Sequence, residues 1–141
     1  MAANTTPIFI LSANVGTARI TGANTTSDAS STTNLVTLVT AGADGTRIDA
    51  VRFRNSQATA ALSSAMVFRI FLSDTGGANY RLVGEVAVTA ATRSVTAIGA
   101  TAIFTFDQPI IMQSGQIMAV CQSVYAGVQD QFDAVAYAGD Y

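Results

Sequence analysis

The side chains that usually perform chemistry near neutral pH are almost absent from this sequence of 141 residues. It contains no His, no Lys and no Trp, with Cys121 as its single Cys and Glu85 as its single Glu. His is the most frequent general acid and base, clusters of His and Cys form most zinc sites, and Schiff-base chemistry requires a Lys. We therefore expect a protein that is not an enzyme and that holds no cofactor.

The groups that could still react are the Asp carboxylates and the thiol of Cys121. Asp130 and Asp133 are the closest carboxylate pair, and clustered Asp oxygens are the ligands that Ca²⁺ prefers. The remaining Asp residues are scattered, so nothing nominates a fuller metal site or the carboxylate pair of a glycosidase. Cys121 has no His to form its thiolate, and its surroundings predict an inert, buried thiol. No catalytic or metal-binding residue is predicted.

Aromatic side chains are the other route to a ligand site, because they can form a platform for a sugar. The four Tyr residues fall in different segments of the chain, so packing at or near the core is the preferred interpretation. They are Tyr80, Tyr125, Tyr137 and Tyr141.

The composition favours a protein that covers much of its surface by association. Charged residues make up 11% of the chain and hydrophobic residues 50%, whereas an average soluble domain has about 25% charged residues. A permanent homo-oligomer or a contact with other subunits fits this composition, and a monomer with Thr-, Ser- and Asn-rich solvent faces is the alternative.

The net charge of −2 and the seven Arg residues provide no basic stripe, so nucleic-acid binding is not expected. No apolar run approaches the ~20 residues that span a bilayer, so no membrane insertion is expected either. The first residues lack the positive region and the apolar stretch of a signal peptide.

Nearly every periodic segment predicts a β-strand, because each is short, rich in β-branched or aromatic residues and bounded by turn residues. The predicted strands are 8–11, 18–22, 34–40, 47–55, 66–73, 80–88, 102–112, 116–123 and 131–138. About eight short strands predict an all-β fold, a single antiparallel sandwich or barrel.

The same pattern divides the single domain 1–141 into two parts. Residues 1–33 are predicted to form an N-terminal arm with long first connections, and residues 34–138 the core of the sandwich. Residues 56–65 predict a loop, with a short helix as the alternative. Pro109 cannot donate to a strand ladder, so it predicts an edge, a bend or a bulge.

The segment 66–88 predicts a hairpin, because two apolar strands flank a turn rich in Gly, Asp and Asn. Matching the apolar faces pairs Leu72 with Leu82 and Phe68 with Val86. This register places Arg69 directly opposite Glu85, and it predicts an ion pair worth at most ~1 kcal/mol if exposed.

Two further strands supply candidate interface residues. Arg52 and Arg54 share one face of the strand 47–55, either as part of a solvated polar face or as a stripe that meets acidic neighbours. The strand 116–123 is apolar on both faces, so it is either covered twice or exposed to another subunit; the composition favours the second, which makes Met118 and Val120 interface candidates. Tyr141, in the weakly patterned C-terminal segment, is the last candidate.

Two hairpin sequences carry a resemblance to a known family. They are FRIFLSDTGGANYRLVGEVAV and FTFDQPIIMQSGQIMAVCQS, and the similarity extends over about residues 35–138. With the N-terminal arm, they resemble the small jelly-roll virion proteins of tailed bacteriophages.

The resemblance implies a capsid decoration (cement) protein, often trimeric, that lies over the joints between major capsid protein subunits. Such a protein is made in the host cytoplasm and ends on the surface of the virion. The alternative is a jelly-roll module of a tail or fibre that binds a cell-surface glycan.

Overall fold

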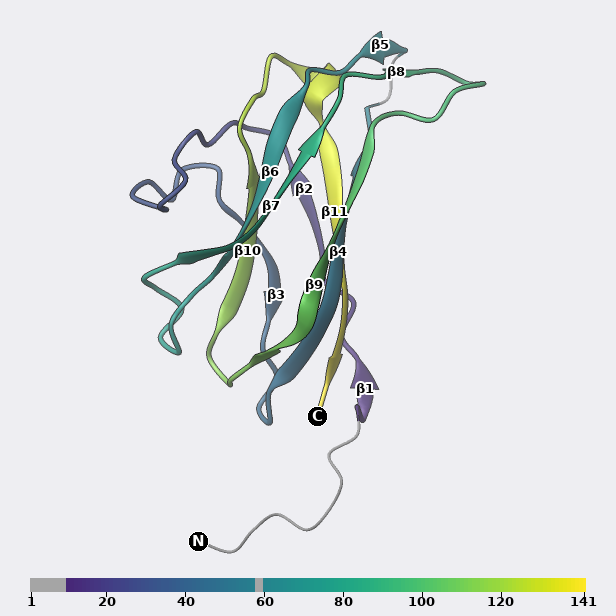
Figure 1. Cartoon of the computed structure of the whole chain (residues 1–141). Helices are drawn as coiled ribbons and strands as arrows, with labels where there is room; N and C mark the ends of the chain where they lie inside the picture. The colour runs from purple at the N-terminus through teal and green to yellow at the C-terminus, as the bar shows by residue number, and fades with distance from the viewer. Residues whose placement is uncertain (1–9, 58–59) are drawn as a thin grey trace, which may run out of the picture.

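Two antiparallel sheets pack face to face in the computed structural model, which describes residues 10–57 and 60–141 (Figure 1). The larger sheet has the order β1-β11-β4-β9, with β2 also paired to β11. Its strands are β1 (Ser12–Ala13), β2 (Thr17–Ile20), β4 (Thr46–Asn55), β9 (Thr101–Met112) and β11 (Phe132–Asp140).

The smaller sheet has the order β3-β10-β6-β7. Its strands are β3 (Val36–Thr40), β6 (Met66–Leu72), β7 (Arg81–Val88) and β10 (Ile117–Gln122). A two-stranded ribbon, β5 (Ala61–Leu62) with β8 (Thr92–Arg93), and the short 3-10 helix η1 (Val128–Asp130) complete the fold.

The expected all-β sandwich is confirmed, and the eight longer strands agree with the predicted segments to within two residues at each end. One expectation is wrong. Strands β1 and β2 belong to the larger sheet and not to an arm, since both pair with β11 and Ile20 is fully buried. Residues 10–11 of the predicted first strand lie just before β1 and are not part of a strand. The described part of 56–65 is a loop, as predicted, apart from the two-residue strand β5. Residues 1–9 and 58–59 lie outside the described residues.

Three Phe rings join the two sheets at the centre of the core. Phe68 of β6 stacks on Phe53 of β4 with ring centroids 4.3 Å apart, and it meets Phe132 of β11 edge-on at 4.8 Å. All three rings are fully buried. Such contacts add to the free energy of burying the rings themselves, so this cluster links the two sheets directly.

The β6–β7 hairpin confirms half of the predicted register. Phe68 lies opposite Val86 and Arg69 opposite Glu85, with Arg69 Nε 2.8 Å from Glu85 Oε1. The predicted pairing of Leu72 with Leu82 is wrong, because β7 contains one extra residue after this point and Leu72 lies opposite Arg81.

The shift begins directly beside Gly84. A Cβ atom built on Gly84 would lie 2.7 Å from the ring of Phe104 in β9, so the ring occupies the space that a side chain would need. The bulge follows directly, between Ile70 and Phe71 on the partner strand, and it turns Val83 toward the core while Leu82 stays partly exposed. A Gly inside a strand often marks such a bulge.

Strand β10 is covered on both faces, which corrects the prediction for Met118 and Val120. Both side chains are fully buried in the core between the sheets, so they are not available as an interface. On the opposite face, Cys121 lies beside Arg69, and its sulfur is 3.9 Å from the backbone oxygen of Asn24. The chain itself thus covers the outer apolar face of β10, which was predicted to meet another subunit.

Strand β9 forms one edge of the larger sheet, where Pro109 was predicted to mark an edge, a bend or a bulge. Residues 106–109 bulge out opposite the single residue Asp49, and regular pairing resumes at Ile110. The prediction for Pro109 is confirmed, since its missing N–H falls outside the ladder.

The carboxylate of Asp140 ties the C-terminal strand to two other segments. It accepts hydrogen bonds from the hydroxyl of Thr46 and from Nδ2 of Asn14, the latter at 2.8 Å. These donors stabilise the charged form and hold the pKa of Asp140 below its usual range.

The core predicts a contrast between two Leu residues. Leu38 of β3 is buried in the core, whereas Leu62 of β5 is exposed. We expect Leu38→Ala to lower the free energy of unfolding by about 2–5 kcal/mol through lost burial and a cavity. Leu62→Ala should lower it by less than about 0.5 kcal/mol. Urea unfolding followed by circular dichroism measures both, and equal losses would contradict this assignment of the core.

The contacts of Asp140 predict a dependence of stability on pH. Its folded pKa is lower than its unfolded pKa of about 3.9, so its contribution is present above about pH 4 and is lost as the pH falls through the folded pKa. Urea unfolding between pH 7 and pH 3 should show a smaller acid-induced loss in Asp140→Asn than in the wild type. Thr46→Val, which removes one donor and keeps the carboxylate, should also reduce that loss. An unchanged loss in both variants would contradict the role of this carboxylate.

Candidate functional site

Four of the seven Arg residues of the chain come together where strand β8 adjoins the outer face of the larger sheet. We call this surface the Arg face and define it by Arg19, Arg52, Arg54, Arg93 and Asp133. It contains a shallow hollow of about 390 Å³, which is also lined by Asn55, Ser56 and Val135.

Strand alternation places these side chains outside. Val51 and Phe53 of β4 point into the core, so Arg52 and Arg54 between and beside them point out. The order of the strands then brings separate segments together. Asp133 of β11 lies opposite Arg54 on one side and opposite Arg19 of β2 on the other.

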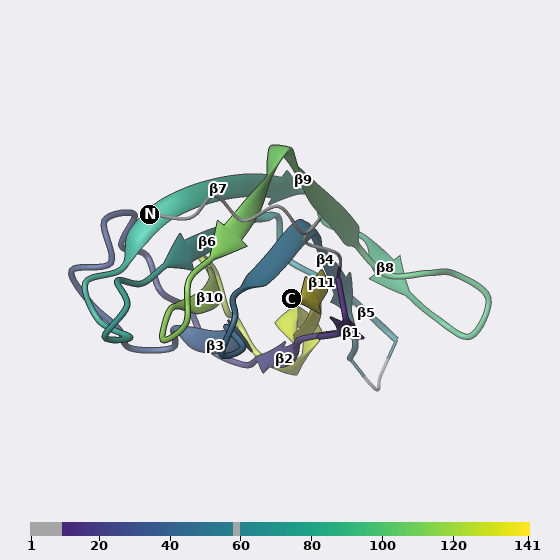
Figure 2. The same ribbon diagram turned by 90° about the horizontal axis from the view of Figure 1, so that it is seen from below.

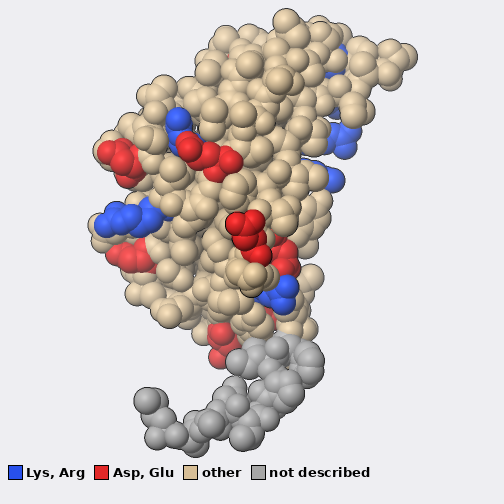
Figure 3. All heavy atoms as spheres, viewed as in Figure 1, with Lys and Arg blue, Asp and Glu red and all other residues tan. Residues whose placement is uncertain are grey.

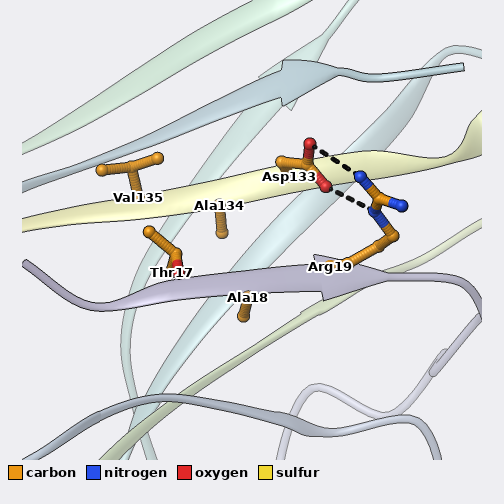
Figure 4. Close-up of a pocket in the computed structure, with 6 residues that line it drawn as sticks. All are labelled: Thr17, Ala18, Arg19, Asp133, Ala134 and Val135. Carbon is orange, nitrogen blue, oxygen red and sulfur yellow. Dashed lines mark hydrogen bonds and ion pairs between the residues drawn. The ribbon is translucent and has the colours of Figure 1, made fainter.

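Asp133 is the only carboxylate on the Arg face, and it is already paired. Arg19 donates to it from Nε at 2.9 Å and from Nη2 at 3.5 Å (Figure 4). This contact raises the pKa of Arg19, so that guanidinium stays charged. The other three Arg residues of the face are left without a carboxylate within salt-bridge distance among the described residues.

The three remaining guanidinium groups form no ion pair among the described residues. Arg52 lies over the ring of Tyr137 at 5.8 Å, and its Nε is buried with no hydrogen-bond acceptor in the described part of the chain. Arg93 donates from Nη1 to the backbone oxygen of Gln57. Arg54 is exposed, and no hydrogen bond of its side chain occurs within 10–57 or 60–141. These groups retain most of their capacity to bind acceptor oxygens.

The charge of the chain is divided unevenly. Four guanidinium groups against one carboxylate give the Arg face a charge of +3. The three other Arg residues and the eight other acidic residues together carry −5, which restores the net charge of −2. At the upper right of Figure 3 the basic side chains have no acidic neighbour in view.

An apolar loop projects beside the Arg face. We call residues 94–98 the finger; they follow β8 and extend away from both sheets in Figures 1 and 2. Val95 is fully exposed and Ile98 is 77% exposed, while Arg54 and Arg93 line the shallow hollow at the base of the finger. Apolar anchors flanked by Arg are typical of protein–protein contacts.

A second hollow of about 510 Å³ lies between β2 and β11 and shares Arg19 and Asp133 with the Arg face (Figure 4). The rest of its lining is Thr17, Ala18, Ala134 and Val135. These small side chains include no base and no nucleophile with a base beside it. The hollow therefore suits contact with another molecule better than a reaction.

The two groups with potential for chemistry have structural roles. Asp130 is fully buried and accepts hydrogen bonds from the N–H of Ser64 at 2.6 Å, the hydroxyl of Ser64 at 2.9 Å and the N–H of Ala126 at 2.8 Å. Asp133 faces Arg19 outside, so the two carboxylates share no site. Burial raises the pKa of Cys121 to about 11, and no group of three metal-ligating side chains occurs among the described residues.

The structure separates the predicted candidates. Arg52 and Arg54 lie on the Arg face, whereas Arg69 and Glu85 pair on the smaller sheet. Tyr141 lies near the opposite end of β4, where its N–H donates to the oxygen of Gly45 at 3.2 Å. Tyr137 is the most exposed of the four Tyr residues, and the others are half-buried in separate segments, so no aromatic platform forms within the described residues.

Arg19, Arg93 and Asp133 were not predicted as members of this face. The signal for two of them was present, because Arg19 precedes the buried Ile20 and Asp133 follows the buried Phe132. That β2 lies beside β11 and β11 beside β4 depends on the topology, which local patterns do not determine.

Comparison with protein-family models, with curated proteins and with solved structures gives no match to this chain. No helix in the described part of the chain has the length and apolar character to cross a membrane.

The surroundings of Cys121 predict a thiol that does not react in the folded protein. At pH 8, where a thiol with a pKa of about 11 is almost fully protonated, Cys121 should be labelled by a maleimide only after unfolding. Mass spectrometry before and after addition of urea measures this. Rapid labelling of the folded protein would contradict the packing of Arg69 and Asn24 over the thiol.

Proposed function

We propose that this protein is a non-enzymatic structural subunit, a capsid decoration (cement) protein that stabilises the head of a tailed phage through contacts between subunits. The observation that carries the proposal is the combination of the Arg face and the apolar finger on one side of the sandwich. Fixed interfaces are enriched in Arg and in apolar anchors, and they need no reactive side chain.

The topology supports a jelly roll as the finer description of the sandwich. Eight of the strands form two four-stranded sets, β2-β11-β4-β9 and β3-β10-β6-β7. Every connection between consecutive members of these sets crosses from one sheet to the other, except the β6–β7 hairpin. Eight strands in two sheets are typical of jelly-roll domains in viral capsids.

The partners follow from the same proposal. The protein forms a homo-oligomer, with a trimer favoured, and binds the major capsid protein on the surface of the virion. Its low content of charged residues supports this, since much of the surface is then hidden in the assembly.

A tail or fibre module that binds a cell-surface glycan is the second candidate. The observation in its favour is the contact between the exposed Tyr137 and Arg52 beside the hollow of the Arg face. A single exposed aromatic ring gives this candidate less support than the finger gives a protein contact.

The purified protein should bind preformed phage shells that lack it and raise the temperature at which they disrupt, because bound subunits stabilise the state that they bind. Val95→Ser, at the tip of the finger, should weaken this binding at least about tenfold, since one Val buried in an interface contributes about 1.5–3 kcal/mol. Val128→Ser changes another exposed Val and should leave binding unchanged. Co-sedimentation and thermal disruption of the shells measure both effects.

Absence of wild-type binding at micromolar concentration would contradict the proposed function. Equal binding by Val95→Ser and the wild type would show that the finger takes no part in the contact with the shell. A specific signal on a glycan array with no shell binding would favour the second candidate.

A further inference from the structure

Along β4, the Arg face lies at one end of the larger sheet, and the other end of the same sheet is acidic. We call it the acidic end and define it by Asp44, Arg47, Asp49, Asp107 and Asp140. These residues lie at or next to the level of Thr46, where β4 begins, or at the bulge of β9 that faces Asp49. Four carboxylates against one guanidinium give this end a charge of −3, equal and opposite to that of the Arg face.

Two carboxylates of the acidic end are unpaired. Arg47 binds Asp49 at 2.8 Å, and Asp140 is held by Thr46 and Asn14. Asp44 and Asp107 are exposed, and neither side chain makes a hydrogen bond or an ion pair within the described residues. They are the carboxylates that a guanidinium from another molecule could reach.

The two charged regions do not neutralise each other within one chain. Eight residue steps of β4 separate Thr46 from Arg54, which corresponds to about 26 Å of extended strand. Exposed charges at that distance are screened at physiological salt, where the Debye length is about 8 Å. Direct contact between two copies would bring the charges within a few ångströms of each other.

Exposed apolar residues accompany both charged regions. Ile103 lies beside Arg52 on the Arg face, and the finger begins at Arg93 of that face. At the acidic end, Ile111 is 55% exposed opposite Arg47, and Leu11 is 81% exposed next to the end of β11. Each end therefore combines apolar contact area with charge, and the charges are opposite.

We propose that the Arg face binds the acidic end of a second copy of this chain, with Arg52 and Arg54 contacting Asp44 and Asp107. The proposed arrangement is head-to-tail, in which the Arg face and the acidic end of one copy meet different neighbours, so the contact is heterologous and closes into a ring of three or more subunits when the rotation allows. Guanidinium–carboxylate contacts fix the geometry, and the apolar residues around them exclude water. The inference deepens the proposed function by naming how its homo-oligomer forms.

A charge-swap series tests this proposal without shells, on the full chain, by analytical ultracentrifugation. The wild type should form a ring of at least three subunits, and its association should weaken as salt is raised. Arg52→Glu with Arg54→Glu, and separately Asp44→Arg with Asp107→Arg, should each raise the dissociation constant at least about tenfold. The chain that carries all four substitutions restores opposite charges at every contact and should recover association.

Two controls keep the series interpretable. Arg81→Glu changes an exposed Arg of the smaller sheet and should leave association unchanged. Arg54→Glu alone changes an exposed position and should also weaken association. This single variant tests the contact if substitution of Arg52 prevents folding. Circular dichroism establishes that each variant is folded.

A wild-type monomer, a closed dimer, unchanged association in the double variants, or no recovery in the fourfold variant would each overturn the proposal. Loss of binding to sulfated or sialylated glycans in Arg52→Glu with Arg54→Glu, with association intact, would assign the Arg face to an anionic carbohydrate. The charge-swap series contains no shells. Its failure would therefore overturn the contact between copies, and the shell-binding experiment would still decide the proposed function.

Discussion

The contact of Phe68 with Phe53 and Phe132 is the constraint on which the rest of the molecule depends, because it fixes the inner faces of both sheets. Side chains alternate along a strand, so an inward Phe53 sends Arg52 and Arg54 outward, and an inward Phe132 does the same for Asp133. The Arg face is thus a consequence of the core. A shift of one residue in β4 or β11 would bury these charges and expose the aromatic rings.

The outer faces of the two sheets differ in how far the chain itself covers them. Over the smaller sheet, the side chain of Arg69 pairs with Glu85 and donates at 3.3 Å to the oxygen of Asn24, so that local contacts cover Cys121. The larger sheet exposes its Arg residues and carries the finger at its rim. A chain with 11% charged residues that places four Arg on one face concentrates its capacity for directed contact there. This asymmetry, together with the scarcity of reactive groups, is why we propose a structural subunit whose function is association.

Local patterns predicted the strands, the hairpin and the pairing of Arg69 with Glu85, because alternation and turn residues act over a few positions. The pairing of Leu72 with Leu82 failed because β7 has one extra residue, Val83, next to Gly84, where the ring of Phe104 packs from a strand distant in the sequence. Met118 and Val120 were assigned to an interface because an apolar strand covered by its own chain has the same pattern as one covered by a partner. The membership of Arg19 and Arg93 in the Arg face required the order of the strands, which no local pattern contains.

The central claim is that the Arg face is a contact surface between subunits. A density map at side-chain resolution of the assembly formed by the full chain tests it most directly. The account predicts that the Arg face of each copy is buried against the acidic end of the next, with Arg54 within salt-bridge distance of a carboxylate from its neighbour. A map in which the Arg face is open to solvent in every copy would contradict the account.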